Sequence, residues 1–442
     1  MTILFCLIIT LIMMLFAVTQ GYFLGIPLSI SLALFSFLLK KRGFSWSAIL
    51  QMGINGSKRG SLVIQTFMLI GAITAGWLSS GTIAYLVSLA FKLLQPSFFL
   101  LSAFWLSSLV SLALGTSFGT CSTIGVVLMV LANSGQVNPY ITAGAIISGI
   151  FLGDRASPMS SALYLLTSLT ETEHYATVKM MLKTTIAPFL LASLAFGIIS
   201  PSHPLHAYNT QLLSDMESTF HLSWPAIIPA LLIFSLCIAK VAVKKAMSIS
   251  IMAAWFIAFF YQGFTISQIF NHLIFGFYLP ADHVLFAVFK GGGLLSMMQT
   301  SYIILIATAI AGLFDQGGLL DALRPFAAKA KSRIALYFNT LVVAFLSGAF
   351  GCNQAISIVM TTETMRPIYN SRGISSLELA RDVSLTAFLI PALIPWNIAS
   401  LVPLTTLGLS GISYLPYAFF LIIGVLYQPL RMYLNQKSIS KY

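Results

Sequence analysis

Long apolar runs alternate with short polar stretches along almost the whole chain. Runs of roughly 17 to 22 residues, such as 2–19, 61–80, 96–114 and 293–313, have the length that an α-helix needs to cross a hydrocarbon core of about 30 Å. A membrane β-barrel would instead show segments of about 10 residues with alternating polarity. The pattern therefore predicts an all-α polytopic membrane protein with about 11 to 14 membrane segments, counted from runs of this length.

Composition agrees with this class. Of the 442 residues, 58% are hydrophobic and 8% are charged, whereas a soluble domain carries about 25% charged residues. Run 2–19 lacks the charged n-region and small-residue cleavage site of a signal peptide, so we expect a retained helix. The four cysteines show no CxxC spacing, which supports neither a disulfide framework nor a zinc site.

The formal net charge of +12 is better explained by membrane orientation than by nucleic-acid binding. Lys and Arg gather in separate clusters, and the polar stretch 201–223 contains none. If the clusters face the cytoplasm, both termini are cytoplasmic and the protein lies in the cell (inner) membrane, with the lipid bilayer as its main partner and a homodimer left open. The clusters fall within 40–59, 155–183, 240–245, 324–333, 366–381 and 431–441.

The two halves of the chain resemble each other. GFSWSAILQMGING at 43–56 resembles GFTISQIFNHLIFG at 263–276, and SLALGTSFGT at 111–120 has a counterpart in AFLSGAFGCN at 344–353. Counting the crossings between the basic clusters places the halves in opposite orientations. We predict a first transmembrane repeat at 1–162, a connecting helix and external loop at 163–223, a second, inverted repeat at 224–405, and a final helix with a cytoplasmic tail at 406–442.

Each predicted repeat contains interrupted helices. Inverted repeats place substrate and ion sites near the bilayer midplane, where paired broken helices meet. Glycines in apolar helices also allow close packing of small residues, which is the structural alternative. The matched position of the interruptions in both halves favours a functional site. The predicted helix-break residues are Gly115, Gly119, Pro158, Gly351, Pro391 and Pro395.

The first half supplies hydroxyl groups and one carboxylate. Thr116, Ser117 and Thr120 offer oxygen ligands of the kind that a small hard cation accepts, although each could simply cap its own helix. Asp154 adjoins a break at Ser157 and Pro158. A carboxylate in the bilayer costs on the order of 3 kcal/mol, so Asp154 is the predicted proton carrier.

Two alternatives limit this interpretation of the acidic residues. Asp154 could lie at the membrane interface, paired with Arg155 or Lys183. The other ten acidic residues, Asp382 among them, and all six histidines fall in predicted loops, helix ends or interfacial pieces. In the second half, the breaks are followed by Asn353, Gln354 and Asn397, so that half offers neutral amide ligands only.

At these residues the sequence resembles the NhaC-type sodium/proton antiporter family of the ion-transporter superfamily, from about residue 43 to 417. GTSFGT at 115–120 resembles the family's Gly-Thr-Ser-Trp-Gly-Thr stretch, and 153–161 resembles its Gly-Asp-Lys-x-Ser-Pro-x-Ser-Asp pattern. GCNQAISIVM, RPIYNSRG and LIPWN resemble motifs of the family's second half. The chain departs from the family at Ser161, Ser384 and Leu385, where family members carry acidic residues.

The resemblance implies sodium/proton exchange, but the family also covers relatives that exchange organic acids or amino acids. We therefore predict a secondary antiporter that exchanges Na⁺ for H⁺ by alternating access; the alternative is Na⁺- or H⁺-coupled transport of a small organic acid or amino acid. No cofactor and no metal other than transported Na⁺ is expected. Because the sequence shows no Walker loop, HExxH motif or nucleophile elbow, we do not expect an enzyme. The predicted ion or substrate ligands are Asp154, Thr116, Ser117, Thr120, Ser157, Asn353, Gln354 and Asn397.

Overall fold

The computed structural model describes residues 3–205, 210–239, 241–280, 282–286, 289–319 and 330–439. Within these ranges, seven helices are long and apolar enough to cross a membrane, or eight if one bent pair counts as a single span, and five shorter apolar helices accompany them. The predicted all-α polytopic class with broken helices is confirmed. The number of crossings stays a prediction, because length and composition do not decide whether the shorter helices span the bilayer.

The helices of the first half are α1 (Ile3–Gln20), α2 (Gly25–Lys41), α3 (Trp46–Ser79), α4 (Thr82–Leu93), α5 (Phe99–Leu114), α6 (Ser117–Thr120), α7 (Val126–Ser134), α8 (Pro139–Ala156), α9 (Ser161–Thr170), α10 (His174–Ile199) and α11 (Thr210–Thr219). Those that follow are α12 (Ile228–Ile238), α13 (Val243–Phe260), α14 (Ile266–Phe275), α15 (Met298–Gln316), α17 (Arg333–Gly351), α18 (Gln354–Ser371), α19 (Ser376–Thr386), α20 (Ile398–Thr406) and α21 (Phe419–Ile439).

Helices α5 and α17 end in the same way, at equivalent positions of the two halves. Helix α5 ends at Gly115, which adopts a left-handed φ of 67°, and Thr116 then caps α6. Helix α17 ends at Cys352 with a left-handed φ of 51°, and Asn353 then caps α18. Both pairs, 115 with 352 and 116 with 353, are 237 positions apart. The two interruptions are therefore matched residue for residue.

The next pair of broken helices keeps the same spacing. Ser160 caps α9 after the break that ends α8, and its hydroxyl accepts a hydrogen bond from the backbone N–H of Leu163. Asn397 caps α20 after the break that ends α19, and its side chain accepts one from Ala399. Positions 160 and 397 are again 237 apart. Each half thus contains two interrupted helix pairs in the same order: α5 with α6 and α8 with α9 in the first half, and α17 with α18 and α19 with α20 in the second.

Helices α3 and α15 are also equivalent, and they pack against each other in opposite directions. They end at 79 and 316, which are 237 positions apart. A Cβ added to Gly56 would lie 2.9 Å from Gly312, whereas one added to Gly71, further along α3, would lie 2.5 Å from Gly293, just before α15. Equivalent helices that pack antiparallel indicate an inverted repeat. The domain boundaries predicted from the sequence stay a prediction.

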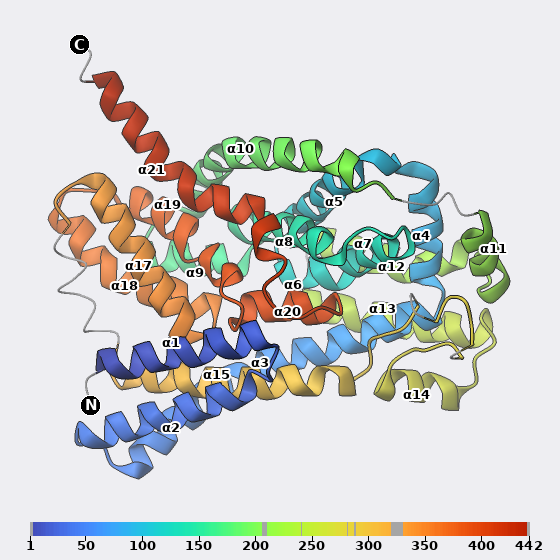
Figure 1. Cartoon of the computed structure of the whole chain (residues 1–442), viewed down its shortest axis with the longest axis horizontal. Coiled ribbons are helices and arrows are strands. Elements are labelled where there is room, and N and C mark those ends of the chain that lie inside the picture. The colour runs from blue at the N-terminus through green and yellow to red at the C-terminus, as the bar shows by residue number, and fades with distance from the viewer. Residues whose placement is uncertain are drawn as a thin grey trace.

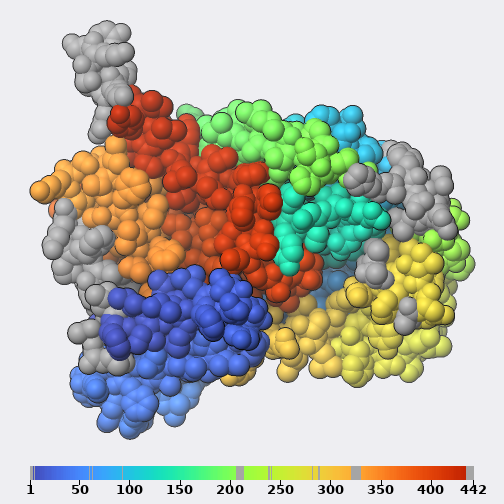
Figure 2. Space-filling view, viewed as in Figure 1, coloured from blue at the N-terminus to red at the C-terminus, as the bar shows by residue number. Residues whose placement is uncertain are grey.

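The broken helices gather beside this antiparallel pair. In Figure 1, α17, α18 and α19 lie toward one end of the long axis and α4 and α7 toward the other, with α6 and α20 between them. Figure 2 shows the C-terminal segment, in red, between the orange and teal segments, with the blue N-terminal helices against it. The breaks of both halves are therefore brought to the middle of the molecule.

Candidate functional site

Asp154 lies in the last turn of α8 and is 6% exposed. Its Oδ1 accepts a hydrogen bond of 2.9 Å from the backbone N–H of Ser117, the first residue of α6. Helix α6 continues through a π-helical turn at 121–125 into α7. The N-terminus of a helix carries a partial positive charge, so this arrangement stabilises the ionised carboxylate.

The second half of the chain reaches the same carboxylate through Gln354. This residue is the first of α18, and its side chain, like that of Ser117, interacts with Asp154. Gln354 Nε2 also donates a hydrogen bond of 3.0 Å to the carbonyl of Phe388, which precedes the break in the second broken pair. Ser117 and Gln354 are equivalent residues, 237 positions apart. The starts of two equivalent helices therefore meet at Asp154.

A cavity of about 600 Å³, which we call the inner cavity, lies beside these helix starts. Its volume falls within the range of small-molecule pockets, about 300 to 1,000 Å³. Asn353, Gln354 and Ser161 contribute to its wall, so one of the positions where the resemblance implied a carboxylate, Ser161, faces the cavity. The remaining wall comes mainly from α3, α15, α18 and α20: Gly56, Val63, Phe118, Ala162, Leu165, Thr308, Ala311, Gly312, Asp315, Ala355, Ile356, Val359, Met360, Ile398 and Ala399.

Three other predicted ligands hydrogen-bond to backbone within the breaks. Thr120 Oγ1 donates to the carbonyl of Thr116, and Ser157 Oγ donates to that of Leu112, each at 2.7 Å. Asn397 is wholly buried, and its Nδ2 donates a bond of 2.7 Å to the carbonyl of Gly348. These three side chains stabilise the backbone at the helix interruptions. Thr116 and Asn353 act as the helix caps described above.

The six predicted helix-break residues lie at or beside the interruptions. Gly115 is required by its left-handed backbone and by its surroundings, since an added Cβ would lie 2.7 Å from the carbonyl carbon of Met159. The others are Gly119 in α6, Gly351 at the end of α17, Pro158 between α8 and α9, Pro391 in the 3-10 turn Ile390–Leu393, and Pro395 just before Asn397.

Arg155 is not the partner of Asp154, although the sequence left that pairing open. Its side chain is wholly buried and turns toward α10 and α19. The guanidinium donates to the hydroxyls of Thr185, Thr184 at 2.6 Å and Ser384 at 3.3 Å. Within the described ranges, no ion pair of Arg155 or Lys183 with a carboxylate is found. Ser384 is one of the positions where the family resemblance implied an acidic residue, and Arg155 meets its hydroxyl there.

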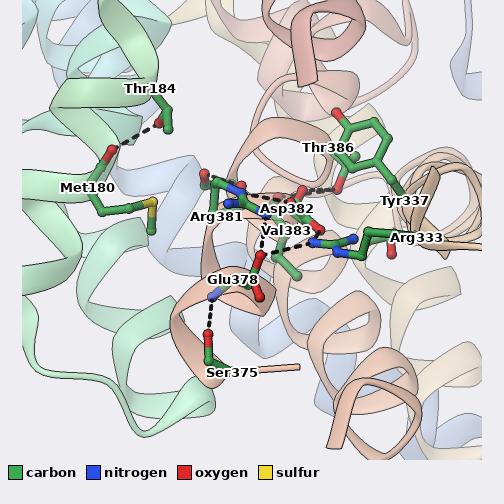
Figure 3. Close-up of polar contacts among 12 residues, drawn as sticks. Met180, Thr184, Arg333, Tyr337, Ser375, Glu378, Arg381, Asp382, Val383 and Thr386 are labelled. Carbon is green, nitrogen blue, oxygen red and sulfur yellow. Dashed lines mark hydrogen bonds and ion pairs between the residues drawn. The ribbon is translucent and has the colours of Figure 1, made fainter. Parts of the chain in front are cut away.

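Asp382 was wrongly expected at a loop or helix end; it is completely buried in α19. Its carboxylate accepts hydrogen bonds from Arg333, from Arg381 at 3.1 Å and from the Tyr369 hydroxyl at 2.9 Å. Figure 3 shows Glu378 beside it, within 3.1 Å of Arg381. The sequence did contain a signal for this charged cluster. Residues four apart lie on one face of a helix, and Glu378 and Asp382 have this spacing, with Arg381 next to Asp382.

Comparison with known proteins gives one family and several relatives. The model of a family described as the Na⁺/H⁺ antiporter family matches residues 149–430, more than half of the chain. The chain is 29% identical to the Na⁺/H⁺ antiporter NhaC of Bacillus subtilis (strain 168), over 90% of each protein. It is 26% identical to the malate-2H⁺/Na⁺-lactate antiporter of the same organism, over 91% of the chain and 88% of the relative. It is also 24% identical to the arginine/ornithine antiporter ArcD of Halobacterium salinarum, over 87% of the chain and 80% of the relative.

Proposed function

The chain belongs to the Na⁺/H⁺ antiporter family, and from this premise we propose that it exchanges Na⁺ for H⁺ at Asp154. It is a multi-pass membrane protein and a secondary antiporter. The observation that carries the proposal is one buried carboxylate that accepts a hydrogen bond from the start of α6, at Ser117. The same carboxylate interacts electrostatically with Gln354, at the start of the equivalent helix α18.

The proposed exchange follows from competition for one carboxylate. Ionised Asp154 supplies oxygen ligands, which Na⁺ as a hard cation prefers, and the Ser117 hydroxyl and the Asn353 amide oxygen would complete the set. Protonation of Asp154 removes the negative charge and releases the Na⁺. Because Ser117 and Gln354 come from different halves, a movement of either broken pair changes the surroundings of the carboxylate.

Alternating access is supported by a second cavity on the other side of the breaks. This outer cavity, of about 320 Å³, is lined by Thr74 and Leu78 of α3, whereas the inner cavity is lined by Gly56 and Val63 of the same helix. From Val63 to Thr74 a helix advances about 16 Å, at 1.5 Å per residue. A site between the two cavities could open to one and then to the other.

We propose that the protein lies in the cell membrane with both termini in the cytoplasm. In Figure 1 the N-terminus, the start of α17 and the end of α18 lie at one end of the molecule. The basic residues Lys40, Lys41, Arg333, Arg366 and Arg372 belong to these segments or to the end of α2. The positive-inside rule places such an end in the cytoplasm, which makes the inner cavity the cytoplasmic one.

A second candidate function is coupled exchange of a small organic solute. The inner cavity, at about 600 Å³, is far larger than a bare cation requires. Two of the relatives carry names with organic substrates, malate with lactate and arginine with ornithine. This candidate uses the same Asp154 site, with the cation as cosubstrate.

Purified protein in proteoliposomes with an interior acid pH gradient tests the proposal. Addition of Na⁺, but not K⁺, should collapse the gradient for the wild type, and Asp154→Asn should abolish this effect. Glu217→Gln, which removes an exposed carboxylate on α11, is the matched control and should behave as wild type. Absence of any cation-driven proton flux in wild type would contradict Na⁺/H⁺ exchange. Flux only after addition of lactate, malate or arginine would favour the second candidate.

A further inference from the structure

Arginine and aspartate are chain neighbours at two places in the helices, and only one of these two couples forms an ion pair. In α19, Arg381 Nε lies 3.1 Å from the carboxylate of Asp382. In α8, Asp154 and Arg155 are also consecutive, and both are buried. Neighbours in a helix of this protein can therefore pair, but the described contacts of Arg155 lead away from Asp154.

The position of the Arg155 guanidinium needs a physical cause. Burial of an ion without an opposite charge costs several kcal/mol. Asp154 and Asp382 are the buried carboxylates among the described residues, and Asp382 already accepts hydrogen bonds from Arg333 and Arg381. Pairing with Asp154 would thus stabilise Arg155, so other contacts must offset the loss of that pair.

Three hydroxyl groups supply these contacts, and we call them the hydroxyl cradle: Thr184 and Thr185 of α10 and Ser384 of α19. Arg155 donates to Thr184 through Nη2 at 2.6 Å, to Thr185 through Nη1, and to Ser384 through Nε at 3.3 Å. Every guanidinium nitrogen thus has a partner in the cradle. A hydrogen bond to a charged group contributes about 1.5 to 3 kcal/mol, so the three together can hold the side chain.

Two of the cradle hydroxyls are oriented to act as acceptors. Ser384 donates its own proton to the carbonyl of Arg381 at 2.7 Å, and Thr184 donates to that of Met180 at 3.1 Å, as Figure 3 shows. A hydroxyl has one proton and two lone pairs, so these oxygens present lone pairs to the guanidinium. The cradle is therefore arranged to accept hydrogen bonds from a cation.

The place of Arg155 matters for the empty state of the carrier. In that state Asp154 has neither Na⁺ nor H⁺, and a buried carboxylate without a partner is unfavourable. If Arg155 reached Asp154, the protein would neutralise the site itself, and the empty site could cross the membrane. Na⁺ would then move without a proton in exchange.

We propose that Thr184, Thr185 and Ser384 are positioning residues that keep Arg155 away from Asp154 and thereby make the exchange obligatory. With Arg155 held in the cradle, Na⁺ and H⁺ are the cations that neutralise Asp154. The inference rests on the exchange proposed at Asp154 and adds to it the reason why the two ion movements stay coupled.

The number of protons exchanged per Na⁺ tests this proposal. Proteoliposomes are loaded with Na⁺ at equal pH on both sides, and equal K⁺ with valinomycin holds the membrane potential at zero. Na⁺ efflux and proton uptake are then measured in parallel. Thr184→Val/Thr185→Val removes two hydroxyls at similar volume and should lower the H⁺/Na⁺ ratio about twofold or more, because Arg155 is released toward Asp154.

Further variants separate positioning from a loss of stability, which lowers the amount of active protein but leaves the ratio unchanged. Arg155→Gln, added to the double variant, should restore the wild-type ratio because it removes the competing cation. Ser384→Asp should keep the wild-type ratio, because a carboxylate there holds Arg155 in place. Thr177→Val is the matched control on α10, since its hydroxyl contacts Thr172 and the Glu173 carbonyl instead.

The outcomes also separate the cradle from the exchange itself. An unchanged ratio in the folded double variant, or a low ratio that persists after Arg155→Gln, would overturn the cradle and leave the exchange intact. If the double variant does not fold, Ser384→Ala removes one acceptor and should lower the ratio less; an unchanged ratio would again overturn the cradle. A wild type without Na⁺-driven proton movement would overturn both proposals.

Discussion

The backbone N–H of Ser117 donates a hydrogen bond of 2.9 Å to the carboxylate of Asp154, although the two residues belong to different broken helices. A backbone donor cannot be removed by changing the side chain of Ser117. The bond therefore depends on the position of α6 relative to α8. Any movement that separates these helices also removes a stabilising contact from the ionised carboxylate, which couples the charge of the site to its conformation.

Transport should depend on pH through competition between Na⁺ and H⁺. At lower pH more Asp154 is protonated, so the apparent KM for Na⁺ should rise, by up to about tenfold per pH unit once the protonated form dominates. The maximal rate at saturating Na⁺ should change less. Initial rates of Na⁺ uptake into proteoliposomes, measured over a pH series with equal pH on both sides, test this. A KM that is independent of pH would exclude competition at one carboxylate.

Ser161→Asp should strengthen cation binding. It adds a carboxylate at a position that faces the inner cavity, and attraction between opposite charges should lower the apparent KM for Na⁺ several-fold. Ser168→Asp adds the same charge to an exposed position of α9 and serves as control. If both substitutions change KM equally, the effect comes from net charge and the inner cavity is not involved.

Asp382→Asn should destabilise the protein strongly. The substitution leaves Arg333 and Arg381 without their buried counter-charge, and removal of one partner from a buried ion pair costs about 3 to 5 kcal/mol. Glu378→Gln should cost less, about 1 kcal/mol or below, because Glu378 is partly exposed. Thermal or denaturant unfolding in detergent measures both. Equal losses of unfolding free energy for the two variants would show that the burial of Asp382 does not determine the size of the loss.

Gly115→Ala should impair both stability and exchange. A left-handed backbone costs an alanine about 1 to 2 kcal/mol, and the new Cβ would clash with Met159. The break should shift, and with it the Ser117 contact to Asp154. Gly53→Ala lies in α3 with no neighbouring atom within 4 Å and should instead be neutral or slightly stabilising. Unfolding temperature and Na⁺-driven proton flux are measured for both variants. If Gly115→Ala behaves as wild type in both, position 115 does not require glycine.

The sequence was sufficient for the features that depend on local chemistry. Apolar runs of membrane length, the glycines and prolines at the breaks, and one carboxylate beside a break are all readable along the chain. It also indicated that two halves are related. The second half contains extra residues between α14 and α15, since Ser45 and Thr265 are 220 positions apart whereas the ends of α3 and α15 are 237 apart. This insert was not recognised, because the sequence does not show where the extra residues lie.

What only the tertiary structure decided is which polar groups meet in the interior. Gln354 reaches Asp154 across 200 positions of the chain, Arg155 turns away from its neighbour toward Ser384, and Asp382 is buried between two arginines. The physical reason is that helix formation and helix breaking depend on neighbouring residues, whereas burial and ion pairing depend on which helices pack together. Hydrophobic patterning thus determined that this chain is a membrane protein with broken helices, and packing of the inverted halves decided that their helix starts converge on Asp154.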